Sequence, residues 1–411
     1  MKYKGLLVFN LISLVFYCII IVTVLNHAAI QELIYSTPDS TQYRDFGRWL
    51  LHTGPGTCSD TRPFLYPAVS QLFDFIGGAN AVWFLQFGLY MLAINLLYRS
   101  IFDLTRNVFF AFTGGILLSF NLSVIVMTLH GLTEMACIFL FTVLIAIVTK
   151  MIREGFTFNR MLLIVLLFVT LTMVKPVFST FIWLSLVLLV YRFYRELKQV
   201  RNLSLLAAVI APVLFQLCLM KINYNEAFIS KIGHITLRDY YYRMLYTDVH
   251  NIPFDNAPDI TEEQIQHTFD ITAKATTSDI VFFSMAHPRR AASIYAFNLR
   301  DNVKAFSPMV YMLKIPSWTK WMDNVNLFYY YLHLLFLIVI PLTAKRAFLT
   351  FGKSARGLFA LYSVAAFIIL SSGISFYQGD RLILPALPLW VFVYAVFGHL
   401  KIQKHGSVRL K

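Results

Sequence analysis

Two acids and three bases lie beside long apolar runs of this chain, at positions where their charge could serve chemistry. Asp39 and Arg62 occur in the polar stretch after the first apolar run, Glu134 and Lys175 occur at the ends of later runs, and Arg381 precedes the last run. A carboxylate can take a proton from a hydroxyl group. A guanidinium beside the free N–H groups of a helix start can bind a phosphate. These residue types therefore suit the handling of a proton and a phosphate.

Each of the five residues also has an ordinary structural explanation. Asp39 could be the N-cap of a helix, and Arg62 could be a surface arginine in contact with lipid headgroups. Glu134 could be a first-turn acid that the helix dipole favours. Lys175 and Arg381 could extend to the headgroups at the membrane surface. The sequence leaves both explanations open for each residue.

Nearby polar residues add no second site. Asp380 is predicted to be a local ion-pair partner of Arg381, and His130 is predicted to be a satisfied histidine at the membrane interface. The other histidines of the outer loops show no metal-ligand spacing such as HExxH. Cys58 alone lies outside the apolar runs, so neither a disulfide framework nor a cysteine metal cluster is indicated. No Walker loop, GxSxG elbow or dinucleotide fingerprint occurs in its required context.

The composition places the chain in a lipid bilayer. Of its 411 residues, 58% are apolar and 14% are charged, which is unlike an ordinary soluble domain. A helix that crosses about 30 Å of hydrocarbon needs roughly 20 mainly apolar residues. An all-α polytopic membrane protein is therefore expected, with ten predicted spans: 6–25, 81–101, 108–126, 133–149, 161–174, 177–191, 203–222, 324–342, 357–373 and 382–400. The fifth and sixth spans are short and could form a re-entrant hairpin instead.

The positions of Lys and Arg predict the orientation of these spans. A cytoplasmic N-terminus places most bases of the short connections inside, as the positive-inside rule requires, and leaves only Lys175 and Arg381 in the opposite short turns. Both termini are then cytoplasmic. The first span is predicted to remain as an anchor, because no small-residue cleavage pattern follows it. Basic inner loops account for the net charge of +14, so no nucleic-acid partner is needed.

Two long polar stretches, 26–80 and 223–323, fall on the outer side and organise the chain. The first belongs to a transmembrane module, 1–222, and the second is a large outer loop in its own right. The remainder, 324–411, carries the last spans and a basic cytoplasmic tail.

Helical spacing within these stretches predicts interfacial helices. Tyr43, Phe46 and Trp49 share one helical face in the first stretch. Residues 65–76 repeat the spacing in a second helix, whose first turn would hold Pro63. Residues 294–303 of the second stretch suit a further surface helix that would cap a cavity. We expect the chemistry of the protein at this outer face.

Four short motifs resemble those of the GT-C glycosyltransferases, polytopic enzymes that use a polyprenyl-phosphate sugar as donor. The motifs are TPDSTQY and RPFLYP in the first outer loop, LTEMACIFLF at the fourth span, and GDRLILPALPLW at the last span. The layout is similar to that of protein mannosyltransferases and of the bacterial aminoarabinose transferase that acts on lipid A. The resemblance covers the first 190 residues best, together with the last span.

The resemblance implies a role for four of the five charged residues. Asp39 would be the catalytic base, and Glu134 would be a second active-site carboxylate. Arg62 would contact the donor phosphate, and Arg381 corresponds more loosely to a phosphate or cavity contact. In the mechanism expected here, Lys175 would join the two arginines in binding the phosphate. Subfamilies with two adjacent acids differ from this chain, in which a serine follows Asp39, so the use of a divalent metal stays open.

The expected function is transfer of a sugar from a polyprenyl-monophosphate donor to an extracytoplasmic glycan, lipid or protein, with inversion of configuration. The expected location is the bacterial inner membrane, with the endoplasmic reticulum as second choice. Two alternatives stay open: a polysaccharide polymerase or ligase that uses diphosphate-linked donors, and a flippase or transporter of lipid-linked sugars. A transporter would carry polar residues at mid-membrane depth, and the predicted spans contain almost none besides His333.

Overall fold

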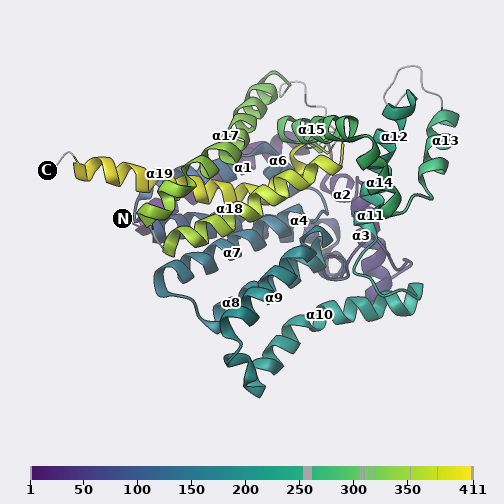
Figure 1. The fold of residues 1–411 in the computed structure, drawn as a ribbon. Helices are drawn as coiled ribbons and strands as arrows, with labels where there is room; N and C mark the ends of the chain where they lie inside the picture. The colour runs from purple at the N-terminus through teal and green to yellow at the C-terminus, as the bar shows by residue number, and fades with distance from the viewer. Residues whose placement is uncertain are drawn as a thin grey trace.

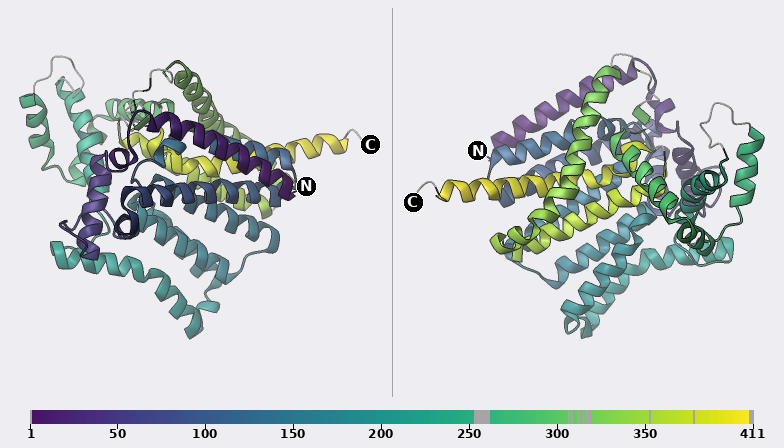
Figure 2. Two further views of the ribbon diagram at one scale, coloured as in Figure 1. Left: turned by 180° about the vertical axis from the view of Figure 1, so that it is seen from behind. Right: turned by 45° about the horizontal axis from the view of Figure 1, so that its top comes forward.

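Most described residues of the chain form helices, and no strand occurs among them. The computed structural model describes residues 2–252, 262–305, 319–351, 353–376 and 378–408, together with 307, 309, 310, 313 and 315. The long helices lie side by side in a bundle, and both ends of the chain lie at the same end of it (Figure 1). Short helices of the two polar stretches gather at the opposite end (Figure 2). The predicted all-α class is confirmed for this part of the chain.

The helices of the first part of the chain end at Tyr224. They are α1 (Lys2–Leu25), α2 (Ile30–Ile34), α3 (Pro38–Leu51), α4 (Leu65–Thr105), α5 (Val108–Ser119), α6 (Leu122–Met127), α7 (Glu134–Glu154), α8 (Phe158–Val174), η1 (Pro176–Phe178), α9 (Ser179–Phe193), η2 (Glu196–Lys198) and α10 (Val200–Tyr224).

The second part begins with the short helices of the second polar stretch. Its elements are α11 (Ile232–Ile235), the π-helix η3 (Thr236–Tyr242), α12 (Arg243–His250), α13 (Glu262–Thr272), α14 (Thr277–Ala286), α15 (Pro288–Lys304), α17 (Thr319–Phe351), α18 (Lys353–Ser371), η5 (Ser372–Ile374), η6 (Gly379–Leu382), η7 (Leu384–Ala386) and α19 (Leu387–Val408).

Six helices in the described part of the chain are long and apolar enough to cross a bilayer, which indicates an integral membrane protein. Their candidate spans are Lys4–Leu25, Leu65–Thr105, Glu134–Glu154, Pro176–Phe193, Val200–Tyr224 and Arg356–Ile374. The other four predicted spans fall on shorter apolar helices, Val108–Ser119, Phe158–Val174, Leu327–Pro341 and Leu384–His399. Helices suit this environment because each backbone N–H and C=O group is satisfied within its own segment.

The predicted span 108–126 is not one continuous helix. α5 ends at Ser119, and Asn121 begins a new helix because its Oδ1 accepts a hydrogen bond from Val124 N at 3.0 Å. Asparagine favours this N-cap position for that reason. The residues after α6 then form an irregular, buried connection to α7.

The first polar stretch contains the two predicted helices, with one changed boundary. The second helix starts at Leu65, so Pro63 precedes it and does not lie in its first turn. It continues into the following span through a bend at Gly77 and Gly78, where Gly78 has a φ of 63°. Glycine favours this left-handed backbone because it has no Cβ. Residues 65–76 and the span after them are therefore one element with a bend.

The helix α7 lies at the centre of the bundle. It packs against α4, α8, α18 and α19 and is mostly buried, whereas α10 packs mainly on α8 and is mostly exposed. Polar contacts join other neighbours: Asn10 Nδ2 of α1 donates to Asn95 Oδ1 of α4 at 3.0 Å. At the end of the bundle that lies away from the termini, α15 packs on η5 and η6.

Candidate functional site

A cavity of about 410 Å³ lies where the two polar stretches meet. Its walls come from α3, the turn between α8 and α9, the α11 and η3 helices, and the segment 371–382. The charged residues that line it are Asp39, Arg62, Lys175 and Arg381. Four of the five predicted site residues therefore share one cavity, although Asp39 and Arg381 are 342 positions apart.

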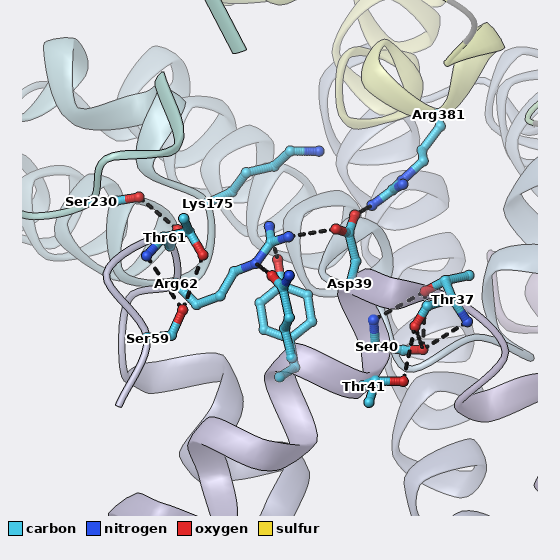
Figure 3. A network of polar contacts seen from close by, with 12 residues as sticks. Thr37, Asp39, Ser40, Thr41, Ser59, Thr61, Arg62, Lys175, Ser230 and Arg381 are labelled. Atoms are coloured by element: carbon cyan, nitrogen blue, oxygen red, sulfur yellow. Dashed lines mark hydrogen bonds and ion pairs between the residues drawn. The ribbon is translucent and has the colours of Figure 1, made fainter. Parts of the chain in front are cut away.

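Asp39 lies in the first turn of α3, and two guanidinium groups hold its side chain. Arg62 Nη2 contacts Oδ1, and Arg381 Nη2 donates to Oδ2 at 2.5 Å. Figure 3 shows the carboxylate between the two arginines. The N-cap of α3 is Thr37, whose Oγ1 accepts from Ser40 N at 3.0 Å. The capping explanation for Asp39 is wrong because Thr37 already satisfies this helix end, which leaves the carboxylate available to the arginines.

Arg62 reaches the cavity from the irregular segment between α3 and α4. Its Nε donates to Gln42 Oε1 at 3.1 Å, and its guanidinium carbon lies 4.9 Å from the centroid of the Tyr43 ring. Ser230 of the second polar stretch fixes the neighbouring backbone, since its Oγ donates to Thr61 O at 2.6 Å. The Arg62 side chain is only 11% exposed, so it is not an ordinary surface arginine.

Glu134 is buried behind the cavity and binds two of the cavity's cations. Its Oε1 accepts from Arg381 Nε at 2.8 Å and from Lys175 Nζ at 3.3 Å. The side chain is 1% exposed and does not line the cavity. Its Oε2 is buried without a hydrogen-bond partner in the described part of the chain. Glu134 therefore fixes Arg381 and Lys175 from behind, whereas Asp39 faces the cavity.

The explanation that Lys175 and Arg381 extend to lipid headgroups is wrong. Their side chains are only 18% and 13% exposed, and both point to the carboxylate of Glu134. A buried carboxylate against an apolar core is costly unless cations compensate it. The need of Glu134 for partners explains why Lys175 and Arg381 occur in the short connections from α8 to α9 and from α18 to α19.

These five residues form a charge cluster, defined here as Asp39, Arg62, Glu134, Lys175 and Arg381, with one positive charge in excess. Burial raises the pKa of Asp39, but the guanidiniums of Arg381 and Arg62 outweigh burial and hold this pKa below its usual value. Burial lowers the pKa of Arg381, and the two carboxylates of the cluster outweigh it, so this pKa lies above its usual value. An anion with one charge would neutralise the cluster.

The helix α15 holds the segment that carries Arg381. Asn302 of α15 is fully buried. Its Nδ2 donates to the backbone carbonyls of Ser372 and Ser375 at 2.9 and 2.6 Å, and its Oδ1 accepts from Gln378 N at 3.2 Å. A single side chain thus binds three backbone groups of this irregular segment, of which only Ser372 O also accepts a bond from another described residue of the segment, from Ser375 N at 3.1 Å.

Asp380 is not the ion-pair partner of Arg381, and this prediction is wrong. Its Oδ1 accepts from Ser307 N at 2.7 Å, and its own N–H donates to Ala305 O at 2.8 Å. Arg381 pairs with the carboxylates of the charge cluster instead. Burial raises the pKa of Asp380 to about 7. Asp380 and Arg381 are adjacent in the sequence but bind different partners, because the tight turn of η6 directs their side chains apart.

His130 lies buried beside the site. Its Nδ1 is 3.0 Å from Leu33 O and 3.2 Å from Ser36 Oγ, while its Nε2 has no partner in the described part of the chain. Burial lowers the pKa of His130 to about 4. The imidazole is therefore neutral at pH 7 and adds no charge to the cluster.

Sequence reasoning missed two residues of this site. Tyr240 lines the cavity from the π-helix η3, and Asn302 supports Arg381 from α15. The run RDYYYRMLY shows that a tyrosine could face a cavity at this place, but the π-helical turn decides which one does. A single asparagine in an amphipathic helix gives no sign of a buried role.

Among the described residues, no group of three or more His, Cys, Asp or Glu side chains could hold a metal ion. The two carboxylates of the charge cluster bind the protein's own cations instead. Comparison with protein-family models, with curated proteins and with solved structures gives no match for this chain. The function of the cavity must therefore be inferred from its own residues and charge.

Proposed function

We propose that this cavity is the active site of a membrane glycosyltransferase that moves a sugar from a polyprenyl-monophosphate donor to an acceptor hydroxyl outside the cytoplasm. The observation that carries the proposal is the position of Asp39, whose carboxylate faces the cavity between Arg62 and Arg381. Guanidinium groups bind carboxylates and phosphates with similar geometry. A phosphate that enters the cavity would meet two arginines already directed at one point.

The charge of the cluster favours a singly charged phosphodiester. A sugar joined to a polyprenyl monophosphate carries one negative charge, which equals the excess positive charge of the cluster. A diphosphate-linked donor carries a second charge with no matching cation among the residues that line the cavity. At an effective dielectric of about 20, one charge at about 4 Å contributes about 4 kcal/mol. The unmatched second charge therefore favours a monophosphate-linked donor over the diphosphate-linked donor that a polysaccharide polymerase or ligase would use.

Asp39 changes partners in the proposed reaction. Before the donor binds, the arginines hold the pKa of Asp39 low, which makes it a weak base. The donor phosphate takes over part of the arginine contacts, so the carboxylate becomes more basic. Asp39 then accepts the proton of the acceptor hydroxyl while that oxygen attacks the anomeric carbon. The bond from this carbon to the phosphate oxygen breaks, its electron pair stays on the lipid phosphate, and the configuration inverts.

The cations of the cluster stabilise the charge that grows on the departing phosphate. Arg62, Arg381 and Lys175 line the cavity and are largely shielded from solvent, so they need little reorganisation during the reaction. Glu134 does not touch the substrate in this scheme. It keeps Arg381 and Lys175 in place, which makes it a positioning residue.

The membrane setting supports a lipid-linked donor. The helices α3 and α11, which contribute to the walls of the cavity, lie at the end of the bundle away from both termini (Figure 1). With cytoplasmic termini, as the positive-inside rule predicts, the cavity opens outside the cytoplasm, where nucleotide sugars are absent. A lipid phosphate supplies its own leaving group there. We assign the protein to a bacterial inner membrane, with a glycan, lipid or protein as acceptor.

The test compares donors and two matched carboxylate variants. Purified protein in nanodiscs is given a polyprenyl-monophosphate sugar, a diphosphate-linked sugar or no sugar donor, together with a membrane extract as the source of acceptor, and release of the lipid phosphate is measured. We expect release from the monophosphate donor and a loss of about a hundredfold or more in Asp39→Asn. Asp74→Asn is the control, because Asp74 pairs with Arg44 at 3.3 Å away from the cavity. Full activity of Asp39→Asn, or release from the diphosphate donor alone, would refute the proposal.

A further inference from the structure

The cavity has a second region besides the charge cluster, and polar side chains without charge line it. We call it the hydroxyl wall, and it consists of Thr236 and Tyr240 of η3 together with Ser375 and Gln378 of the segment after α18. Every charged residue that lines the cavity belongs to the charge cluster, within the described part of the chain. The hydroxyl wall therefore offers hydrogen bonds without charge.

The polar side-chain atoms of the hydroxyl wall form no hydrogen bond with another described residue. Neighbouring hydroxyls in the same lining behave differently, because Ser371 Oγ donates to Ile368 O at 2.9 Å and Ser372 Oγ donates to Ile369 O at 2.7 Å. The segment after α18 thus keeps some hydroxyls for its own backbone and leaves others facing the cavity. Hydroxyl and amide groups both donate and accept, so they match the hydroxyls of a ligand.

The position of Tyr240 depends on the π-helix. The π-helical turn at Thr236–Tyr242 widens the helix, and such turns occur frequently at functional sites. The Tyr240 ring packs at 5.2 Å from the ring of Phe376, which fixes its direction. Burial raises the pKa of Tyr240, and the charge of Asp39 raises it further. Its hydroxyl is therefore a permanent donor close to the charge cluster.

We propose that the hydroxyl wall binds the sugar of the donor and selects a neutral, hydroxyl-rich sugar over sugars that carry an amino or carboxylate group. This inference rests on the proposed function, because the phosphate must occupy the charge cluster for the sugar to reach the wall. A sugar bonded to that phosphate extends directly into the remaining space of the cavity. Hydrogen bonds from Thr236, Tyr240 and Gln378 then fix the ring so that its anomeric carbon faces Asp39.

Gly233 provides a way to block the hydroxyl wall without touching its members. It lines the cavity one turn before Thr236, and a Cβ added there would meet no atom within 4 Å. A leucine at this position would fill the space expected for the sugar and would leave the charge cluster unchanged. Gly88 of α4 is the matched control, because a Cβ there also meets no atom within 4 Å and Gly88 does not line the cavity.

The experiment measures the binding of soluble probes to the protein in nanodiscs by calorimetry. One probe is the methyl ester of a short prenyl phosphate, and another is the same prenyl phosphate bonded to a neutral hexose, so both are phosphodiesters with one negative charge. A further probe carries an amino or carboxylate sugar in place of the neutral hexose. We expect the hexose to strengthen binding by about tenfold or more in the unchanged protein, as several neutral hydrogen bonds would. Tyr240→Phe should reduce this gain about fivefold, and Gly233→Leu should abolish it. Both variants should bind the prenyl phosphate without the sugar as the unchanged protein does.

Two matched substitutions away from the cavity control for general damage. Tyr241→Phe removes a hydroxyl one position further, from a ring that packs against Leu245, Ala291 and Ile294 away from the cavity. Gly88→Leu adds the same bulk elsewhere. Neither should change the gain from the hexose. If Gly233→Leu fails to fold, the Tyr240→Phe and Tyr241→Phe pair decides the question.

Three outcomes would contradict this inference, and the last of them would also contradict the proposed function. If the hexose adds nothing to the binding of the unchanged protein, the hydroxyl wall is not a sugar site, but the phosphate site stands. If a prenyl phosphate that carries an amino or carboxylate sugar binds as tightly as the neutral form, the selection for neutral sugars is wrong. If none of the probes binds the unchanged protein, the proposed function fails and the inference fails with it.

Discussion

The segments that carry Asp39 and Arg381 face each other across one ion pair, yet they are built in different ways. Asp39 lies in a regular helix whose start is fixed by its own neighbours, because Thr37 Oγ1 accepts from Ser40 N at 3.0 Å. Arg381 lies in short 3₁₀ turns between α18 and α19. Its segment depends on Asn302, which lies 70 positions before Ser372 in the sequence.

This difference separates what a helix can fix locally from what only the assembled fold can fix. Helix caps involve contacts over three or four residues and form with the helix. Bonds between Asn302 and the segment after α18 form only when the second polar stretch has folded onto the bundle. Asp39 should therefore keep its position under perturbations that displace Arg381.

Arg381→Ala is expected to have the largest effect, because it removes the contacts of Arg381 with both Asp39 and Glu134. Transfer should fall by about a hundredfold or more, which is the loss of one phosphate contact of about 3 kcal/mol. The free energy of unfolding should fall by about 3 kcal/mol, since Glu134 stays buried with one cation fewer. Transfer assays and thermal unfolding in detergent measure the two effects.

The double variant Arg381→Ala with Glu134→Gln separates the two roles of Arg381. It should recover stability, because the buried carboxylate is gone, but it should not recover transfer. Recovery of both would show that Arg381 acts only through the stability of the fold.

Asn302→Ala is expected to have the second effect, because it breaks three hydrogen bonds that hold the Arg381 segment. At about 1 kcal/mol for each bond, the unfolding free energy should fall by about 3 kcal/mol. Transfer should fall about tenfold, mainly through weaker donor binding, since the misplaced arginine still carries its charge. Asn298→Ala is the control, because Asn298 is also buried but makes a single bond of 3.3 Å to Gly373 O. Equal losses of transfer and stability in Asn302→Ala and Asn298→Ala would show that Asn302 has no special role in holding the Arg381 segment.

Thr37→Ala is expected to have a smaller effect and tests the local side of the comparison. Loss of this N-cap should reduce the unfolding free energy by about 1 kcal/mol and transfer by about threefold at most. Thr157→Ala is the control, because Thr157 caps α8, where its Oγ1 accepts from Arg160 N at 3.4 Å, far from Asp39 in the chain. It should lower stability and leave transfer unchanged. A transfer loss in Thr37→Ala as large as that in Asn302→Ala would mean that Asp39 is not held locally.

Asp380→Asn is expected to have the smallest effect on the cavity, and it should change how stability depends on pH. The pKa of Asp380 is about 7 in the folded protein and 3.8 for an ordinary aspartate. Because the folded state binds the proton more tightly, the contribution of Asp380 to stability is fully present below about pH 4, is lost as the pH rises to about 7 and changes little above that. Thermal unfolding at pH 5 and pH 8 should show this slope in the unchanged protein and a flatter one in Asp380→Asn. An unaltered slope would place the titrating group elsewhere.

Much of the helix content could be predicted from the sequence, because apolar length and helical spacing are local properties. Six predicted spans fall on helices long and apolar enough to cross a bilayer, and four fall on shorter apolar stretches. Two of these stretches, Leu327–Pro341 and Leu384–His399, overlap the longer helices α17 and α19. The break at Asn121 was missed because the apolar run continues through it, and only the hydrogen bond to Val124 N reveals the new helix start. The same limit explains the shifted start of α4 at Leu65.

The members of the charge cluster could be selected from the sequence, but their arrangement could not. Charge beside apolar runs identified Asp39, Arg62, Glu134, Lys175 and Arg381 as unusual. The sequence could not tell that Glu134 is buried behind the others while Asp39 faces the cavity. Burial depth depends on how helices pack, and the pairing of Asp380 with the backbone of Ser307 depends on a contact 73 positions apart.

The order of synthesis gives the Arg381 contacts a further consequence. A ribosome makes Asp39 and Glu134 long before it makes residue 381, so in the early bundle Lys175 is the one ion-pair partner of Glu134 among the described residues. The segment between α18 and α19 then brings Arg381 as a second cation beside this buried acid. Chains that stop before this point are expected to hold Glu134 with one cation fewer and to be removed by membrane proteases.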